Sequence, residues 1–184
     1  MTEVKKEDNG FLPEGYEIPK TPSSYMKFEE GNTKFLPLAG VVVGYEYWTV
    51  DSKPVRLTEA PKELPSDIKK KEDGSPTRVS PFWAFPVWNY EDEAVQILEI
   101  TQKGIMQAIK SLAESEDWGS PVMKYSLTVN RVGKGLETEY STLPNPAKDV
   151  PEEVTKAWAE VQKNDFDITR LFENGDPFSA TVKA

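Results

Sequence analysis

The sequence predicts a mainly β domain in which five strands are interrupted once by a helix, followed by a helical C-terminal segment. Segments rich in β-branched and aromatic residues recur between residues 36 and 143, a helical spacing of apolar residues appears at residues 101–116, and helix signals return near the C-terminus. The chain has 184 residues and no internal repeat, which is the length of one domain with additions.

The chain divides into three parts by composition. Residues 1–33 hold three prolines, three glycines and many charges, so we expect a partly irregular N-terminal arm whose apolar residues pin its second half onto the domain. Residues 34–146 carry the predicted strands and form the domain. Residues 147–184 form a helical appendix and tail, with a helix that starts at Pro151 and a short second helix at 167–172.

The first strand is predicted at residues 36–49, which are aromatic and β-branched. Glycines interrupt this segment, and we expect a bend near Gly40 or Gly44. Residues 50–78 then contain four prolines and a lysine run, so we expect a long connecting loop between the first and second strands, which we call the excursion.

The remaining elements are predicted from the spacing of apolar residues, which changes along the chain between the patterns of strands and of helices. The second strand, residues 79–90, holds five aromatic residues and two prolines, and a turn leads into the third strand at 93–100, so these two form a hairpin. The helix at 101–116 comes next. Alternating polar and apolar residues at 125–132 and a last β segment at 136–143 complete the five strands.

Five strands with one helix between the third and the fourth have the connectivity of the OB-fold. This fold is a Greek-key barrel that binds oligonucleotides or oligosaccharides. A generic α+β sheet would also accommodate these elements, but the long glycine-bent first strand and the position of the helix favour the five-stranded barrel.

The composition excludes several classes of chemistry. The chain contains no histidine and no cysteine, which removes Ser-His-Asp and Cys-His catalysis, disulfides and Cys/His zinc sites. The acidic groups at 91–93, 114–117 and 137–139 lie at a turn, a helix end and a strand, and no nucleotide-binding or nucleophile motif occurs. We therefore expect a protein that is not an enzyme.

The net charge of −9 argues against a nucleic-acid partner only when it is taken as a whole. Residues 1–33, 34–144 and 145–184 each carry a net charge of −3, and basic residues cluster on the excursion from Lys53 to Arg78. A basic face is therefore permitted. The chain has no apolar run of about 20 residues and no signal-like start, so we expect no membrane segment and a cytoplasmic location.

Aromatic residues on the first two strands are the sharpest functional signal. Alternate residues of a strand face opposite sides, so these rings form two sets, and both sets cannot belong to one core. We expect one set to be partly exposed beside the basic excursion, as in proteins that stack single-stranded nucleic acid on aromatic rings. Packing of that set against the arm or the appendix is the alternative. The rings are those of Tyr45, Tyr47, Trp48, Phe82, Trp83, Phe85, Trp88 and Tyr90.

Several sequence blocks, taken in order, resemble a known family. The blocks are Val43-Gly44-Tyr45-Glu46-Tyr47-Trp48, Lys53-Pro54-Val55-Arg56, Phe82-Trp83-Ala84-Phe85, Val87-Trp88-Asn89-Tyr90, Gln96-Ile97-Leu98-Glu99-Ile100-Thr101-Gln102, Gly135-Leu136-Glu137-Thr138-Glu139-Tyr140 and Pro144-Asn145-Pro146. With them, residues 34–146 resemble the OB-fold single-stranded DNA-binding proteins of tailed bacteriophages and prophages.

The resemblance implies a non-enzymatic protein that coats single-stranded DNA in phage replication, recombination or repair, in the cytoplasm of the bacterial host. It implies single-stranded DNA as the partner, replication or recombination proteins as further partners, and no cofactor. Its implied DNA contacts are Tyr47, Trp48, Arg56, Arg78, Phe82, Trp83 and Trp88.

Two features depart from that family. Its bacterial relatives end in an acidic run that closes with Pro-Phe, whereas residues 165–184 hold only four acids against two bases and Asp176-Pro177-Phe178 is internal. The zinc ligands of one phage branch are also absent, so we expect no metal. Two other functions stay open: a protein-protein interaction module that uses the aromatic barrel face, and a barrel that binds oligosaccharides.

Overall fold

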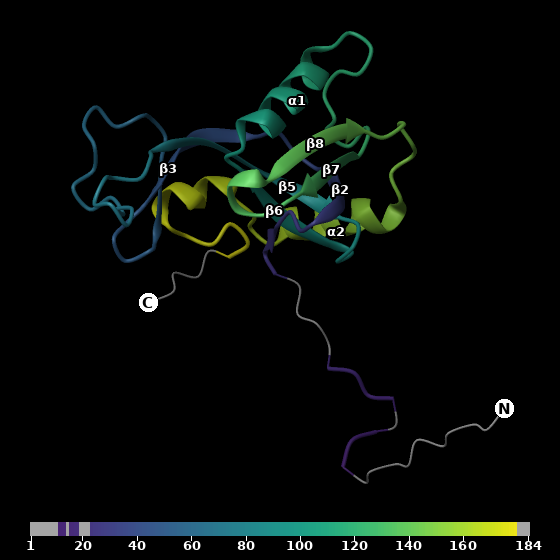
Figure 1. The fold of residues 1–184 in the computed structure, drawn as a ribbon. Helices are drawn as coiled ribbons and strands as arrows, with labels where there is room; N and C mark the ends of the chain where they lie inside the picture. Colours follow the sequence, from purple (N-terminus) through teal and green to yellow (C-terminus); the bar gives the residue numbers. More distant parts are fainter. Residues whose placement is uncertain (1–10, 14, 19–22, 180–184) are drawn as a thin grey trace, which may run out of the picture.

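A computed structural model describes residues 11–13, 15–18 and 23–179. In this part of the chain, eight strands form one mixed, open sheet, accompanied by two α-helices and two short 3₁₀ helices (Figure 1). The strands are β1 (Tyr25–Met26), β2 (Gly31–Pro37), β3 (Val42–Trp48), β4 (Pro54–Leu57), β5 (Ser80–Asn89), β6 (Ala94–Ile100), β7 (Leu127–Val132) and β8 (Glu139–Pro144).

The helices lie where the sequence predicts them. The helix α1 (Lys103–Glu114) stands between β6 and β7, and the appendix holds α2 (Glu152–Lys163) and the 3₁₀ helix η2 (Ile168–Glu173). The predicted last strand starts later than expected, because its first residues form the 3₁₀ helix η1 (Gly135–Glu137), where Gly135 has a positive φ of 59°. Predictions about residues 1–10 and 180–184 lie outside the described residues.

The predicted first strand is bent, and the bend divides it into β2 and β3. The break covers residues 38–41 and includes Gly40, as predicted near that glycine. Both halves pair with β5: β3 pairs with the first part of β5, and β2 pairs with its last part. The Leu38 N–H donates to the Pro86 carbonyl at 2.9 Å across the break. The first strand therefore follows β5 along its whole length.

The strand order places β5 at the centre of the sheet. The order is β1-β6-β5-β2-β7-β8, with β3 on β5 and β4 on β3. The predicted hairpin of β5 and β6 is confirmed, and its register runs unbroken from Trp83↔Ile100 to Asn89↔Ala94 through Pro86. The strand β1 pairs parallel to β6, so the second half of the arm is held on the sheet as expected. Part of the long excursion forms β4.

Both faces of the central strand are covered. The helix α1 packs Ile105, Met106 and Ile109 into a core with Phe85 and other residues of one face of the sheet. The other face meets the appendix, whose α2 and η2 lie on the side opposite α1 in Figure 1. The C-terminal helices are therefore part of the fold and decide which aromatic rings remain accessible.

At Gly44, β3 lies close to the appendix. A Cβ atom at this position would lie 2.5 Å from the Leu57 carbonyl oxygen and 2.7 Å from the Phe172 ring. Overpacking of this kind costs about 1–3 kcal/mol. We expect Gly44→Ala to lower the free energy of unfolding by that amount in urea denaturation. The matched variant Gly40→Ala, whose Cβ would meet no atom within 4 Å, is the control and should unfold at nearly the wild-type midpoint.

Candidate nucleic-acid interface

Three of the seven sequence-predicted contact residues are buried in this structure. Phe82 packs against Phe172 of η2 with ring centroids 5.8 Å apart, and Trp88 lies in the cluster that includes Trp158 of α2. Tyr47 is also buried, and its hydroxyl donates to Asp67 Oδ1 at 3.1 Å. The expectation of accessible rings fails at these positions, because the appendix and the excursion cover them.

The other four residues have different surroundings. Trp48, the last residue of β3, keeps 45% of its surface exposed. Trp83 is half-buried at the border of the α1 core, and its Cα faces that of Val43 across the β3–β5 pair. Arg78 is exposed on the chain that enters β5, whereas Arg56 on β4 is almost buried. Trp48 and Arg56 line the same cleft.

This cleft has a volume of about 460 Å³ and lies where β1, β3, β4, β6 and β8 approach one another. Four aromatic rings contribute to its walls, and two of them, Phe28 and Tyr140, meet edge to face at 6.1 Å. We call it the aromatic cleft. Its lining residues are Tyr25, Met26, Lys27, Phe28, Trp48, Arg56, Glu99, Gln102 and Tyr140.

Most of these lining residues were missed as contact residues by sequence reasoning. Tyr25 and Phe28 come from the arm, which β1 brings to the outer edge of β6. Gln102 and Tyr140 lie in sequence blocks that carry the family resemblance. The apolar residues of the arm and those two blocks were the available signals, but nothing in the sequence shows that they meet.

One cation and two carboxylates form a buried group at the aromatic cleft, which Arg56 and Glu99 line. Arg56 Nε is 2.6 Å from Glu99 Oε1 and 3.2 Å from Glu46 Oε2, and only 11% of the Arg56 side chain is exposed. These three atoms are buried, and among the residues that the structure describes they have no further hydrogen-bond partner. The ion pairs join β3, β4 and β6, and the group carries one excess negative charge. Arg56 is therefore already neutralised by acids of its own chain.

Burial is the main cause that raises the pKa of Glu46, repulsion from Glu99 adds to it, and Arg56 opposes it. A carboxyl whose pKa is higher in the folded than in the unfolded state contributes stability at low pH, which is lost as the pH rises through the folded pKa. We therefore expect Glu46→Gln to gain stability relative to wild type as the pH rises from acidic toward neutral. Urea denaturation across this range measures the effect, with the exposed Glu160→Gln as control. A relative loss at pH 7 would contradict this expectation.

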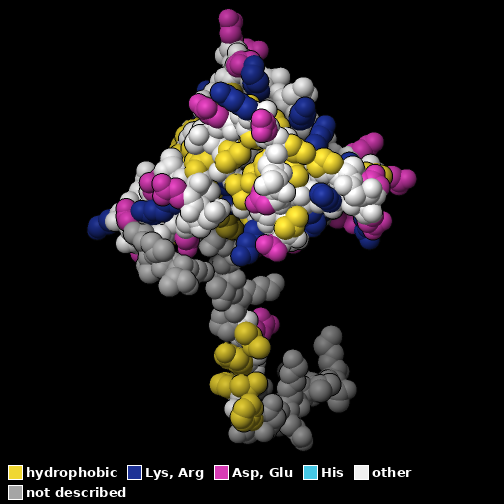
Figure 2. Space-filling model, turned by 90° about the vertical axis from the view of Figure 1, so that its left-hand side faces the viewer, with side chains coloured by type: hydrophobic (Ala, Val, Ile, Leu, Met, Phe, Trp, Pro, Cys, Tyr) yellow, Lys and Arg dark blue, Asp and Glu magenta, His cyan; other side chains and the backbone are white. Residues whose placement is uncertain are grey.

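A basic pocket adjoins the aromatic cleft at the start of α1. Gln102 lines the cleft, while its neighbours Thr101 and Lys103 line a pocket of about 290 Å³ together with Arg78. The residues that line this basic pocket include two cations and no acid. Figure 2 views the molecule from the side of residues 50–78 and shows hydrophobic side chains gathered in the middle of that face, with charged side chains around them.

In comparisons with known proteins, no family model, no curated protein and no solved structure matches this chain. Within the described residues, neither α-helix is long and apolar enough to cross a membrane. In the same part of the chain, no group of three or more acidic, His or Cys side chains is placed to hold a metal ion.

Proposed function

We propose that this chain is an OB-type domain that binds single-stranded DNA without sequence preference, in phage or prophage replication, recombination or repair. The observation that carries the proposal is the aromatic cleft, with the exposed Trp48 at its wall and the basic pocket beside it. Stacking of successive bases on aromatic rings next to a basic groove is how such proteins hold a single strand.

The strand connections support an OB-type domain. The bent strand made of β2 and β3 pairs with β5, and β2 also pairs with β7. The helix α1 stands between the β5–β6 hairpin and the β7–β8 hairpin. Five strands with one helix after the third agree with an OB-fold, and in this assignment β1 and β4 are additions.

The charges predict how the strand lies in the site. The group of Arg56, Glu46 and Glu99 has one carboxylate in excess and repels phosphate, so the bases point into the aromatic cleft and the phosphates face the outer cations. Lys27, Arg78 and Lys103 are exposed around the cleft and the basic pocket and can receive them. A duplex keeps its bases paired and stacked, so it cannot bind in this way.

Fluorescence anisotropy with labelled oligo-dT and with a matched duplex, each at several salt concentrations, tests the proposal. We expect a preference for the single strand and a log-log salt slope of about −0.7 for each phosphate contact. Equal affinity for the duplex, or an oligo-dT affinity that does not change with salt, would refute the proposal.

The double variant Arg78→Gln/Lys103→Gln tests the role of the basic pocket. Loss of two phosphate contacts should reduce the magnitude of the salt slope by about 1.4 and weaken binding at low salt. Lys110→Gln/Lys156→Gln removes two exposed lysines that form helical pairs with Glu114 and Glu152, and its slope should stay close to wild type. Identical slopes in the two double variants would place the phosphates elsewhere.

A protein-protein interaction module is the second candidate. It is favoured by Val41 and Val43, which are exposed to 43% and 61%. Retained affinity for a phage or host protein without any affinity for oligo-dT would select this function.

A further inference from the structure

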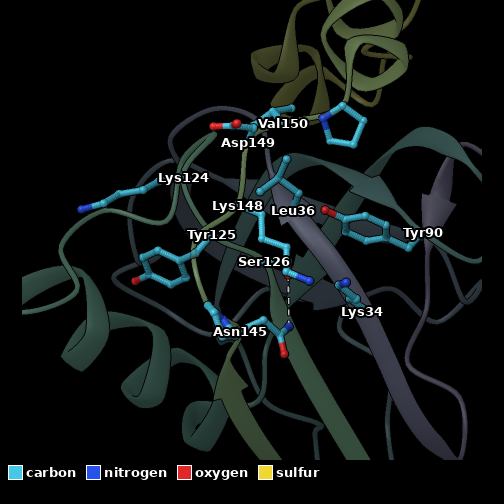
Figure 3. A pocket seen from close by; sticks show the side chains of 12 residues that line it. Lys34, Leu36, Tyr90, Lys124, Tyr125, Ser126, Asn145, Lys148, Asp149 and Val150 are labelled. Atoms are coloured by element: carbon cyan, nitrogen blue, oxygen red, sulfur yellow. Dashed lines mark hydrogen bonds between the residues drawn. The ribbon is translucent and has the colours of Figure 1, made fainter.

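A second, smaller pocket lies away from the aromatic cleft, between the end of β8 and the segment that leads into α2. It has a volume of about 140 Å³, and three lysines and one acid are its charged lining residues, although the chain carries a net charge of −9. The charged residues are Lys34, Lys124, Lys148 and Asp149 (Figure 3). This pocket therefore has a local excess of positive charge, opposite in sign to the net charge of the chain.

Two of the three lysines are free to act on a ligand. In Figure 3, Lys34 and Lys148 reach toward Ser126 from two sides, whereas Lys124 and Asp149 extend away from that point. Lys124 Nζ already donates to the Trp118 carbonyl at 2.9 Å. Within the described residues, neither Lys34 nor Lys148 forms an ion pair with an acid.

The side chains around these lysines are held in place. Lys34 Nζ lies 4.4 Å from the centroid of the Tyr90 ring, a cation–π contact that orients the ammonium without neutralising it. Asn145 Nδ2 donates to Ser126 Oγ at 3.1 Å and to Thr128 Oγ1 at 2.9 Å. Ser126 also has a side-chain hydrogen bond with Tyr90, so these polar side chains form one network beside the two lysines.

We propose that Lys34 and Lys148 form a binding site for a phosphate group, beside Ser126. Two ammonium groups that approach one position without a carboxylate repel each other, and a bound oxyanion relieves that repulsion. The pocket has about 140 Å³ against 460 Å³ for the aromatic cleft, so it suits a single oxyanion better than a base with its sugar. The site does not depend on the proposed DNA binding, because the phosphate can be free or part of a strand.

Titration of the full chain with inorganic phosphate, followed by amide NMR at constant ionic strength balanced with chloride, tests the site. We expect saturable shifts at Ser126, Asn145 and Lys148 that chloride does not produce. Lys34→Gln/Lys148→Gln should weaken the apparent affinity by about 10-fold or more, as expected for lost charge-assisted hydrogen bonds. Lys110→Gln/Lys156→Gln, which keeps the pocket, should titrate like wild type. An equal response to chloride, or full affinity in Lys34→Gln/Lys148→Gln, would overturn the proposal.

The same variants identify the source of the phosphate. If Lys34→Gln/Lys148→Gln also lowers the salt slope for oligo-dT, the strand supplies the phosphate. If only the response to inorganic phosphate is lost, the ligand is free phosphate or a mononucleotide. A chain that fails to bind oligo-dT at all would refute the proposed DNA function and leave the phosphate titration unaffected.

Discussion

Replacing Arg56 by methionine is expected to lower the free energy of unfolding by about 3–5 kcal/mol. The reason is the buried group in which Arg56 Nε faces both Glu99 and Glu46. Methionine keeps much of the side-chain volume but removes the only cation of the group, which leaves two carboxylates close together with little access to water. Urea denaturation at neutral pH measures the loss.

Two controls distinguish the cost of leaving buried charges unpaired from the cost of losing an ion pair as such. Lys156→Met breaks the exposed pair with Glu152 and should cost less than about 1 kcal/mol. The triple variant Glu46→Gln/Arg56→Met/Glu99→Gln removes every charge of the group and should recover most of the stability, because no unpaired ion remains buried. The cost of Arg56→Met should also shrink at acidic pH, because protonation of Glu46, whose pKa is raised by burial, removes one of the two like charges. A cost as small as that of Lys156→Met would contradict the prediction.

The order of the elements could be predicted because each long element has a regular spacing of apolar residues. The alternation in β7 and the helical spacing of Ile105, Ile109 and Leu112 are local patterns, and both segments adopt the structure that the pattern predicts. The short strands β1 and β4 carry no such pattern. Their two and four residues become strands only because β6 and β3 offer free edges to them. Such pairing depends on residues distant in sequence, so it was not predictable.

The site was predictable in part for the same reason. Strand alternation indicates that Phe82 and Trp88 share one face of β5, but it does not say what covers that face. The cover comes from Phe172 and Trp158, some 70 or more residues further along the chain. Arg56 was expected to meet phosphate, yet two acids from neighbouring strands already occupy its guanidinium. Trp48 keeps the predicted exposure because it ends its strand at the wall of the cleft.

That exposure makes Trp48 the residue whose loss should most affect binding of single-stranded DNA. Trp48→Ala is expected to weaken affinity for oligo-dT by about 5- to 150-fold, the equivalent of the 1–3 kcal/mol that one stacked base contributes. The thermal midpoint should change little, because nearly half of the ring is in contact with solvent. Anisotropy with a labelled oligonucleotide measures the affinity independently of tryptophan emission.

Two variants make this prediction specific to stacking. Trp48→Phe keeps an aromatic face and should lose less affinity than Trp48→Ala, whereas an apolar contact without stacking would make the two variants alike. Leu143→Ala truncates another exposed apolar residue, which lines neither the aromatic cleft nor the basic pocket, and should bind like wild type. If Trp48→Ala keeps full affinity while Trp83→Ala loses it, the bases lie instead on the side of β5 that faces α1, and the aromatic cleft is not the site.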